Sequence, residues 1–165
     1  LFFARFAKPT ARLAFSNVAL IATHDGVPSF IFRMANERAG IIAEANFRVT
    51  VLRNEVTAEG EAYRNLVDLK LEREYSPIMA VTWTAVHPIT PDSPLHGITP
   101  EKLVEWDAEF IVSVSGIDDT FSDTIHTRFS YRPEEIVWNK QFKDILSYDS
   151  TGHLTINLSN LHETI

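Results

Sequence analysis

The sequence contains no cysteine among its 165 residues, which excludes disulfide bonds and metal sites built on thiolates. It also has no apolar run that approaches 18 residues, and its longest aliphatic stretch is the short segment VALIA. We therefore expect no transmembrane helix and no signal peptide. The motifs HExxH, GxSxG, GxGxxG and the P-loop are missing too, so we expect no enzyme.

Acidic residues are missing from the beginning of the chain, although the chain as a whole is acidic. No Asp or Glu precedes Asp25, and Arg5, Lys8 and Arg12 give the first 24 residues a charge of +3, against −7 for the whole chain. The acidic balance argues against nucleic-acid binding and favours a surface that attracts cations. The charges alone leave open whether the basic start is a frayed terminus or a segment with its own role.

Alternation of apolar and polar residues is the main structural signal. In GIIAEANFRVTVLRN, residues 40–54, the odd positions from Ile41 to Val51 predict a buried face, with Glu44 and Arg48 on the polar face. Residues 63–73 and 107–115 alternate in the same way, the former with Tyr63 on the buried face. Further strands are expected within residues 13–23, 29–36, 78–86, 124–131 and 154–158.

Turn signals separate these strands, at Asp25-Gly26 and at several later glycines. Many short strands between turns predict an all-β fold of the sandwich type. One short helix is expected after Thr99, which suits an N-cap, with Pro100 at the first helical position.

Three further features bear on possible sites. The six histidines form no metal-binding pair, and we interpret them as surface or hydrogen-bonded residues. The segment SGIDDTFSD suits an acidic hairpin tip better than a calcium site, because its spacing matches no calcium-binding loop. The segment VHPITPDSPLHGITP, residues 86–100, is too rich in proline for a central strand and forms either a packed loop or an interface to a partner.

An ordered set of segments resembles the cytoplasmic domain of inward-rectifier potassium channels, particularly the prokaryotic ones. The segments are FAKPTAR, DGVPSFIFRMANER, IIAEANFRV, TAEGE, WTAVHPITPDSPLHG, GIDDT, TRFSY, EEIVWNKQF and NLHET. Each segment alone is weak evidence for this resemblance. The combination of HPIxxxSPLxG with EIxWxxxF about 40 residues later is specific.

The resemblance implies an immunoglobulin-like β-sandwich of the E-set type that forms a homotetramer below a membrane pore. Residues 1–12 would form a membrane-proximal basic linker, and residues 13–165 the β-sandwich domain. The transmembrane domain would belong to the same polypeptide, so we expect a soluble fragment of a channel at the cytoplasmic face of the bacterial inner membrane. Potassium would be the transported ion, and block by multivalent cations is possible; no cofactor, resident metal or nucleic acid is implied. We also group the chain with voltage-gated channels.

Two pore-lining residues follow from the resemblance. Glu44 matches an acidic position, where four copies would form a ring that concentrates K⁺ and attracts multivalent blockers. Ser115 matches a position that carries an acid in many eukaryotic relatives, and Asp118 and Asp119 are possible partial replacements for that acid.

A candidate gating loop also follows from the resemblance. In it, Gly116 would supply backbone freedom and Ile117 an apolar constriction. The matched residues are Gly116, Ile117, Asp118, Asp119 and Thr120.

Basic residues complete the implied site. Arg5, Lys8 and Arg12 match a lipid-facing linker, for which attraction to anionic lipid is expected and a specific phosphoinositide site stays open. Arg38 and Arg48 match basic positions at intersubunit or membrane-facing surfaces, with ordinary surface ion pairing as the alternative. The alternative for the whole chain is a soluble immunoglobulin-like binding module, which the sandwich pattern and the proline-rich segment also allow.

Overall fold

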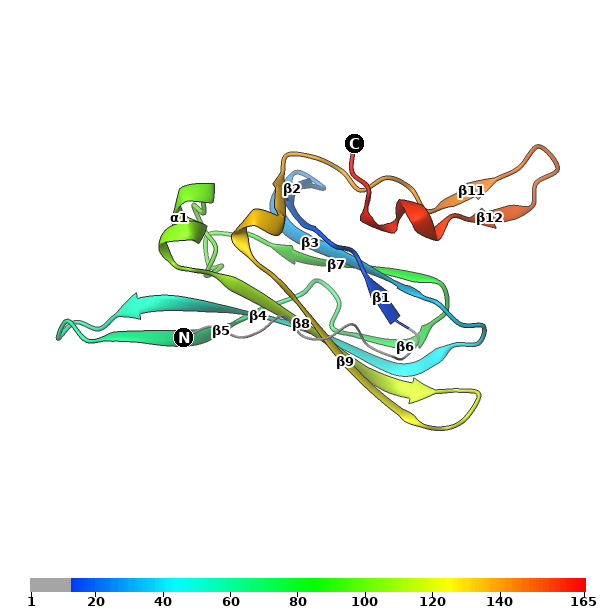
Figure 1. Ribbon diagram of the computed structural model, residues 1–165, viewed down its shortest axis with the longest axis horizontal. Coiled ribbons are helices and arrows are strands. Elements are labelled where there is room, and N and C mark those ends of the chain that lie inside the picture. The colour runs from blue at the N-terminus through cyan, green and yellow to red at the C-terminus, as the bar shows by residue number, and fades with distance from the viewer. Residues whose placement is uncertain (1–12) are drawn as a thin grey trace.

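Two five-stranded β-sheets stacked face to face form the body of the computed structural model, which describes residues 13–165 (Figure 1). Within these residues, the helical segments are short and lie either in connections between strands or after the last strand. This architecture confirms the predicted all-β sandwich with one short α-helix. Arg5, Lys8 and Arg12 lie outside the described residues.

The first sheet is built around the ten-residue strand β3, which pairs antiparallel with three neighbours. β7 pairs with residues 29–35 of β3. β2 and β1 pair with the two ends of β3, and β10 pairs with β2 in parallel. The strands are β1 (Leu13–Phe15), β2 (Ala19–His24), β3 (Val27–Asn36), β7 (Thr82–Pro88) and β10 (Ile136–Trp138).

The second sheet is built around the fifteen-residue strand β4. β8 pairs with β4 antiparallel and carries β9 on its other edge, whereas β5 and β6 pair with opposite ends of β4. The strands are β4 (Ile42–Val56), β5 (Ala62–Leu69), β6 (Tyr75–Met79), β8 (Glu109–Asp118) and β9 (Thr124–Tyr131).

Aromatic rings from both sheets fill the space between them. Phe30 of β3 stacks on Phe110 of β8 with ring centroids 4.3 Å apart, and Phe47 of β4 stacks on Trp83 of β7 at 4.5 Å. Both pairs join one sheet to the other, and such stacked rings stabilise a core beyond the area they bury.

Most strand predictions are confirmed, and the exceptions have structural causes. Around β8 the predicted buried residues 108, 110, 112 and 114 are buried, but Glu109 at the start of the strand is buried as well. The predicted strand 78–86 is divided, because the chain leaves the second sheet after Met79 and enters the first at Thr82. The predicted strand 13–23 is likewise divided into β1 and β2.

The prediction that Tyr63 lies on a buried face is wrong, since this residue is 43% exposed. It lies where the β4–β5 hairpin projects beyond the sandwich, as Figure 1 shows at the left. No second sheet covers this part of the hairpin, so an alternating pattern there does not lead to burial.

The remaining elements are short and lie at the ends of the sandwich. Helix α1 (Pro100–Glu105) begins as predicted, because the Thr99 hydroxyl accepts a hydrogen bond from the Lys102 amide. A separate hairpin of β11 (Leu146–Tyr148) and β12 (Leu154–Ile156) projects from the body, and the predicted strand 154–158 ends at residue 156. Two 3₁₀ turns, η1 (Pro133–Glu135) and η2 (Leu158–His162), complete the chain.

Candidate functional site

A β-bulge in β4 forms the centre of the candidate site. Ala43 pairs with Ile117 and Asn46 pairs with Ser115, so Glu44 and Ala45 together oppose the single residue Gly116. Glu44 has φ of 52°, in the left-handed region that non-glycine residues seldom occupy. Such a conformation costs about 1–2 kcal/mol for a residue with a side chain.

The bulge changes which residues of β4 face the core. Ile42 and Ala45 are both fully buried, whereas Ile41 and Ala43 are only partly buried. The prediction of a buried odd-numbered face is therefore wrong before the bulge and correct from Ala45 onward. Glu44 is exposed, as the polar-face prediction requires.

Two hydrogen bonds hold Glu44 on the outer face of the sheet. The Tyr75 hydroxyl of β6 donates to Glu44 Oε2 at 2.7 Å, and Asn46 Nδ2 donates to the Glu44 carbonyl at 3.0 Å. The hydrogen bond to the Glu44 carboxylate is also the main reason why the pKa of Tyr75 is raised above its usual value. Tyr75 was not predicted as a site residue, because its contact depends on the pairing of β6 with β4, which residue type and spacing do not show.

Ser115 and Gly116 lie directly across from the bulge. Ser115 is paired with Asn46 on one side and with His126 on the other. A Cβ atom on Gly116 would lie 2.6 Å from Ile42 Cγ2 and 2.9 Å from the Ala43 carbonyl oxygen. Gly116 does not have positive φ, so the close approach of β4, rather than the predicted backbone freedom, makes glycine the residue that fits.

The expected gating loop consists partly of strand. Gly116, Ile117 and Asp118 end β8, and only Asp119 and Thr120 belong to the turn that leads to β9. Ile117 is 41% exposed, on the same outward side as Ser115. The candidate pore residues and the candidate gate thus meet at one end of the second sheet.

Asp118 stabilises this turn from a buried position. Its side chain is 5% exposed, and Oδ1 accepts hydrogen bonds from the amides of Thr120 at 2.8 Å and Phe121 at 3.3 Å. Asp119 and Asp123 remain exposed at the hairpin tip. No cluster of three or more potential metal-binding side chains occurs within residues 13–165.

The two predicted basic positions differ in their surroundings. Arg38 is exposed in the connection between β3 and β4, where its amide donates to Asn36 Oδ1. Arg48 lies on the outward face of β4, and its guanidinium is 3.8 Å from the Asp68 carboxylate. Both partners of this ion pair are largely exposed, so the pair itself adds little stability.

Comparison with known proteins places this chain in a family. The sequence profile of the inward rectifier potassium channel C-terminal domain matches residues 13–165. The chain is 36% identical over 163 residues to the inward rectifier potassium channel Kirbac3.1 of Paramagnetospirillum magnetotacticum, and 32% identical over 173 residues to the human inward rectifier potassium channel 4. The chain belongs to the inward rectifier C-terminal domain family.

The match covers nearly all of this chain but only part of the relatives. It includes 99% of the chain and 55% of the bacterial channel, and 98% of the chain and 38% of human channel 4. The matched family is one of channel domains rather than enzymes. The matched relatives are named inward rectifiers, so the grouping with voltage-gated channels was wrong. Within residues 13–165, no helix is long and apolar enough to cross a membrane.

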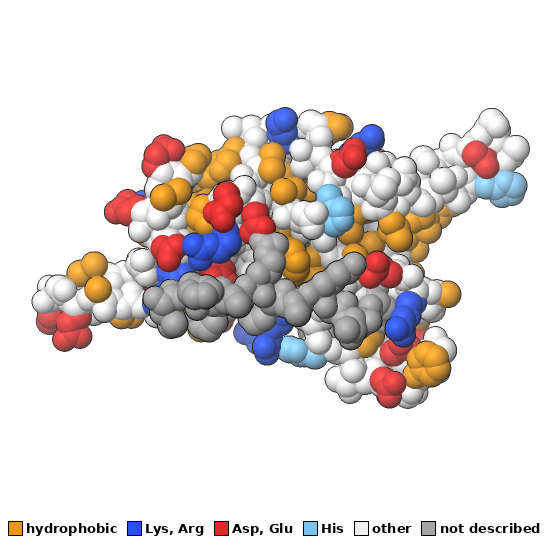
Figure 2. Space-filling view, in the orientation of Figure 1, with side chains coloured by type: hydrophobic (Ala, Val, Ile, Leu, Met, Phe, Trp, Pro, Cys, Tyr) orange, Lys and Arg blue, Asp and Glu red, His pale blue; other side chains and the backbone are white. Residues whose placement is uncertain are grey.

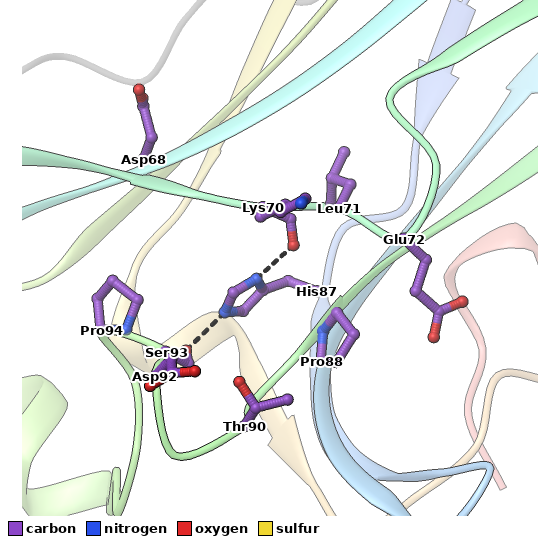
Figure 3. Close-up of a pocket in the computed structure, with 10 residues that line it drawn as sticks. All are labelled: Asp68, Lys70, Leu71, Glu72, His87, Pro88, Thr90, Asp92, Ser93 and Pro94. Carbon is purple, nitrogen blue, oxygen red and sulfur yellow. Dashed lines mark hydrogen bonds between the residues drawn. The ribbon is translucent and has the colours of Figure 1, made fainter.

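In this inward rectifier domain the proline-rich segment is a packed loop. Ile89 and Leu95 are buried, and His87 at the end of β7 bridges the loop to the segment after β5 (Figure 3). His87 Nδ1 lies 2.6 Å from the Lys70 carbonyl oxygen and Nε2 lies 2.7 Å from Ser93 Oγ. Since a carbonyl only accepts, neutral His87 carries its proton on Nδ1 and accepts at Nε2 from Ser93.

A cavity of about 600 Å³ opens beside this bridge. Its walls combine charged side chains with Leu71, Pro88 and Pro94. Burial lowers the pKa of His87, although its hydrogen bond to the Lys70 carbonyl acts in the opposite direction. His87 is thus a hydrogen-bonded buried histidine, as the sequence analysis expected.

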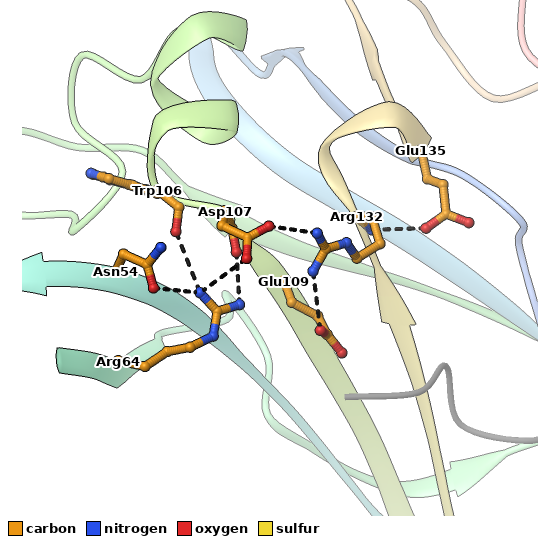
Figure 4. Close-up of polar contacts among 7 residues, drawn as sticks. All are labelled: Asn54, Arg64, Trp106, Asp107, Glu109, Arg132 and Glu135. Carbon is orange, nitrogen blue, oxygen red and sulfur yellow. Dashed lines mark hydrogen bonds and ion pairs between the residues drawn. The ribbon is translucent and has the colours of Figure 1, made fainter. Parts of the chain in front are cut away.

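A charge network lies at the other end of the second sheet, near α1 (Figure 4). Arg132 Nη2 donates to Asp107 Oδ1 at 2.6 Å, Arg132 Nη1 lies 3.4 Å from Glu109 Oε1, and Arg64 Nη2 donates to the Asp107 carbonyl at 2.7 Å. Burial by itself would lower the pKa of Arg132, but the neighbouring carboxylates outweigh burial and raise it. The network joins the start of β8 to the end of β9 and serves the fold.

Charges of both signs are mixed on the face of the molecule that Figure 2 shows. The face shown in Figure 2 has acidic, basic and apolar side chains interspersed among the residues drawn in colour. Neither sign of charge dominates the coloured side chains on this face.

Proposed function

We propose that this chain is the cytoplasmic pore and gating domain of a tetrameric inward rectifier potassium channel. Four copies surround an axis that continues the ion pathway, and potassium ions pass along it without a cofactor or catalysis. The transmembrane domain lies on the same polypeptide, at the cytoplasmic face of a bacterial inner membrane. Intracellular or lipid signals act on the membrane pore through this domain.

The exposed Glu44 carboxylate at the bulge is the observation that carries this proposal. It lies on the outer face of the sheet, beside Ser115 and the hairpin that ends β8. Fourfold repetition turns one carboxylate into a ring of four, which concentrates K⁺ and attracts multivalent cations. Ser115 contributes a neutral position to the same wall, and Asp118 is left out of the ring because its carboxylate is buried in the turn.

The hairpin at residues 116–120 forms the constriction. Ile117 presents an apolar side chain that narrows and dewets the pathway. Because Gly116 is in tight contact with Ile42 and Ala43, a shift of the hairpin moves the bulge that carries Glu44. The gate and the charge ring are therefore mechanically linked.

Basic residues connect the domain to its surroundings. Arg5, Lys8 and Arg12 form the linker toward the membrane and attract anionic lipid. Arg38 and Arg48 are exposed and contact a neighbouring subunit or the membrane surface.

Replacement of Glu44 by glutamine in the full-length channel tests the proposal. Loss of four ring charges should raise the Mg²⁺ concentration that half-blocks K⁺ current from the cytoplasmic side by about tenfold, equivalent to about 1.4 kcal/mol. Inside-out patches or planar bilayers measure this block. Glu59→Gln is the matched control, because Glu59 is an exposed acid at the distant β4–β5 turn and should leave block unchanged.

Unchanged block in Glu44→Gln would contradict the pore position of Glu44. Assembly is tested separately, by single-particle imaging of the detergent-solubilised channel. A particle without fourfold symmetry would overturn the tetramer itself.

A further inference from the structure

The Glu44 carboxylate is oriented by a neutral partner. Tyr75 lies in β6 opposite Asn46, and the pairing of β6 with β4 brings its hydroxyl to Glu44 Oε2, 2.7 Å away. No Lys, Arg or His within residues 13–165 forms an ion pair with Glu44. The contact therefore fixes the direction of the carboxylate and leaves its charge intact.

The partner is well suited to fixing a direction. A tyrosine side chain has only two rotatable angles and a rigid ring, so its hydroxyl occupies a small volume. Asn46 holds the backbone of Glu44 through the carbonyl, while Tyr75 holds the far end of the side chain. Glu44 is thus restrained at both ends, although its side chain is exposed.

We propose that Tyr75 is a positioning residue, whose hydroxyl holds the Glu44 carboxylate in one orientation and so sets how tightly the ring binds a multivalent cation. This inference rests on the proposed pore function. A ring of four charges binds a single cation best when all four point to the same place, because each attraction weakens with distance. Without the phenol, each carboxylate would swing among rotamers, and the cation would meet the same total charge spread over a larger volume.

The chain offers a matched control pair for this arrangement. Tyr63 of β5 donates to Glu55 Oε1 at 2.8 Å, and the residue is as exposed as Tyr75, 43% against 42%. This second pair lies on the projecting β4–β5 hairpin. Tyr63→Phe therefore removes the same kind of hydrogen bond away from the bulge.

The first experiment measures cytoplasmic Mg²⁺ block in the full-length channel with Tyr75→Phe, Glu44→Gln and Tyr63→Phe. Tyr75→Phe should raise the half-blocking concentration by about threefold, less than Glu44→Gln does, because the four charges remain and only their hydrogen bonds are lost. Tyr63→Phe should not change it. In the double variant Glu44→Gln/Tyr75→Phe, block should equal that of Glu44→Gln alone, because the hydroxyl then has no charge to position.

The outcomes separate this inference from the proposed function. If Glu44→Gln weakens block but Tyr75→Phe does not, or if Tyr63→Phe weakens block equally, the positioning role is overturned and the ring stands. If Glu44→Gln itself leaves block unchanged, the proposed pore function of Glu44 is contradicted, and the inference that rests on it falls as well.

A second experiment tests the contact directly, without ion conduction. In the 165-residue chain, Glu44→Gln should lower the pKa of the Tyr75 phenol toward its usual value. NMR of the tyrosine ring carbons during an alkaline titration measures this pKa. Glu55→Gln should lower the pKa of Tyr63 instead and leave Tyr75 unchanged. A Tyr75 titration that is the same with and without Glu44 would overturn the inference.

Discussion

At the scale of single residues, the bulge combines three positions that each tolerate few side chains. Glu44 occupies left-handed backbone, Gly116 leaves no space for a Cβ atom, and Asp118 is buried where its carboxylate satisfies two amides of the turn. Strained or crowded positions persist only where the surrounding structure holds them in place. Here the pairing of β4 with β8 provides that support.

Gly116→Ala should lower the free energy of unfolding by about 1–3 kcal/mol, the usual cost of overpacking. The added methyl group would meet Ile42 Cγ2 and the Ala43 carbonyl, and the backbone carbonyl has little freedom to move away. Urea denaturation of the 165-residue chain measures this change. Ser115→Ala is the control, since Ser115 points outward, and equal stability of the two variants would contradict the close approach.

Residue type and alternation were enough to predict that Glu44 is exposed, but not how it is held. Its partner Tyr75 lies 31 residues further along the chain, and the contact depends on the pairing of β6 with β4. The bulge was equally unpredictable, because the sequence IIAEANF keeps a plausible alternation across it. The close approach at Gly116 also depends on the register of two strands that lie far apart in the sequence.

At the scale of elements, β4 has two parts with different environments. Its first part pairs with β6 and β8 and contains the bulge, whereas its end pairs with β5 alone in the projecting hairpin. Alternation predicted burial correctly where both sheets overlap, as in β8, and incorrectly at Tyr63, where only one sheet is present. A local pattern shows which residues share a face but not whether another layer covers that face.

Helix α1 depends on its N-cap, because its six residues are too few to be stable alone. Thr99→Ala should lower the free energy of unfolding by about 1 kcal/mol, since the hydroxyl accepts from the Lys102 amide at 3.1 Å. Leu103 of this helix is fully buried, so loss of the helix would also disturb the packing of the core.

The matched control for this cap is Thr99→Ser, which keeps the hydroxyl and should stay close to wild type. Chemical denaturation followed by tryptophan fluorescence measures both variants. Equal losses in Thr99→Ala and Thr99→Ser would show that the methyl group of Thr99, rather than its hydroxyl, supports the helix.

At the scale of the whole molecule, polar bridges tie the connections to the two sheets at separate places. His87 joins the proline-rich loop to the segment after β5, and the Asp107–Arg132 pair joins the start of β8 to the end of β9. Arg33 bonds to the carbonyls of Asn160 and Leu161 and so fixes the carboxyl-terminal 3₁₀ turn to β3. Among these groups, His87 has an ordinary pKa closest to neutrality, so it makes stability depend on pH.

His87 should make the domain less stable in mild acid. Its pKa is lowered in the folded state, chiefly by burial, whereas in the unfolded chain it is about 6.5. Below about pH 6.5 the unfolded state therefore binds more protons than the folded state, and the free energy of unfolding falls as pH decreases. The contribution of neutral His87 is fully present above about pH 6.5 and is lost as pH falls toward the lower folded pKa.

Urea denaturation at about pH 7.5, 6.5 and 5.5 measures this dependence, with His87→Gln for comparison. The glutamine variant should be less stable at neutral pH, because the bridge between Lys70 and Ser93 is weakened, yet it should lose less stability on acidification than the wild type does. His126→Gln removes an exposed histidine and should keep the wild-type slope. If His87→Gln and the wild type lose stability in parallel between pH 7.5 and 5.5, the acid sensitivity belongs to other groups, and the buried bridge contributes only to packing.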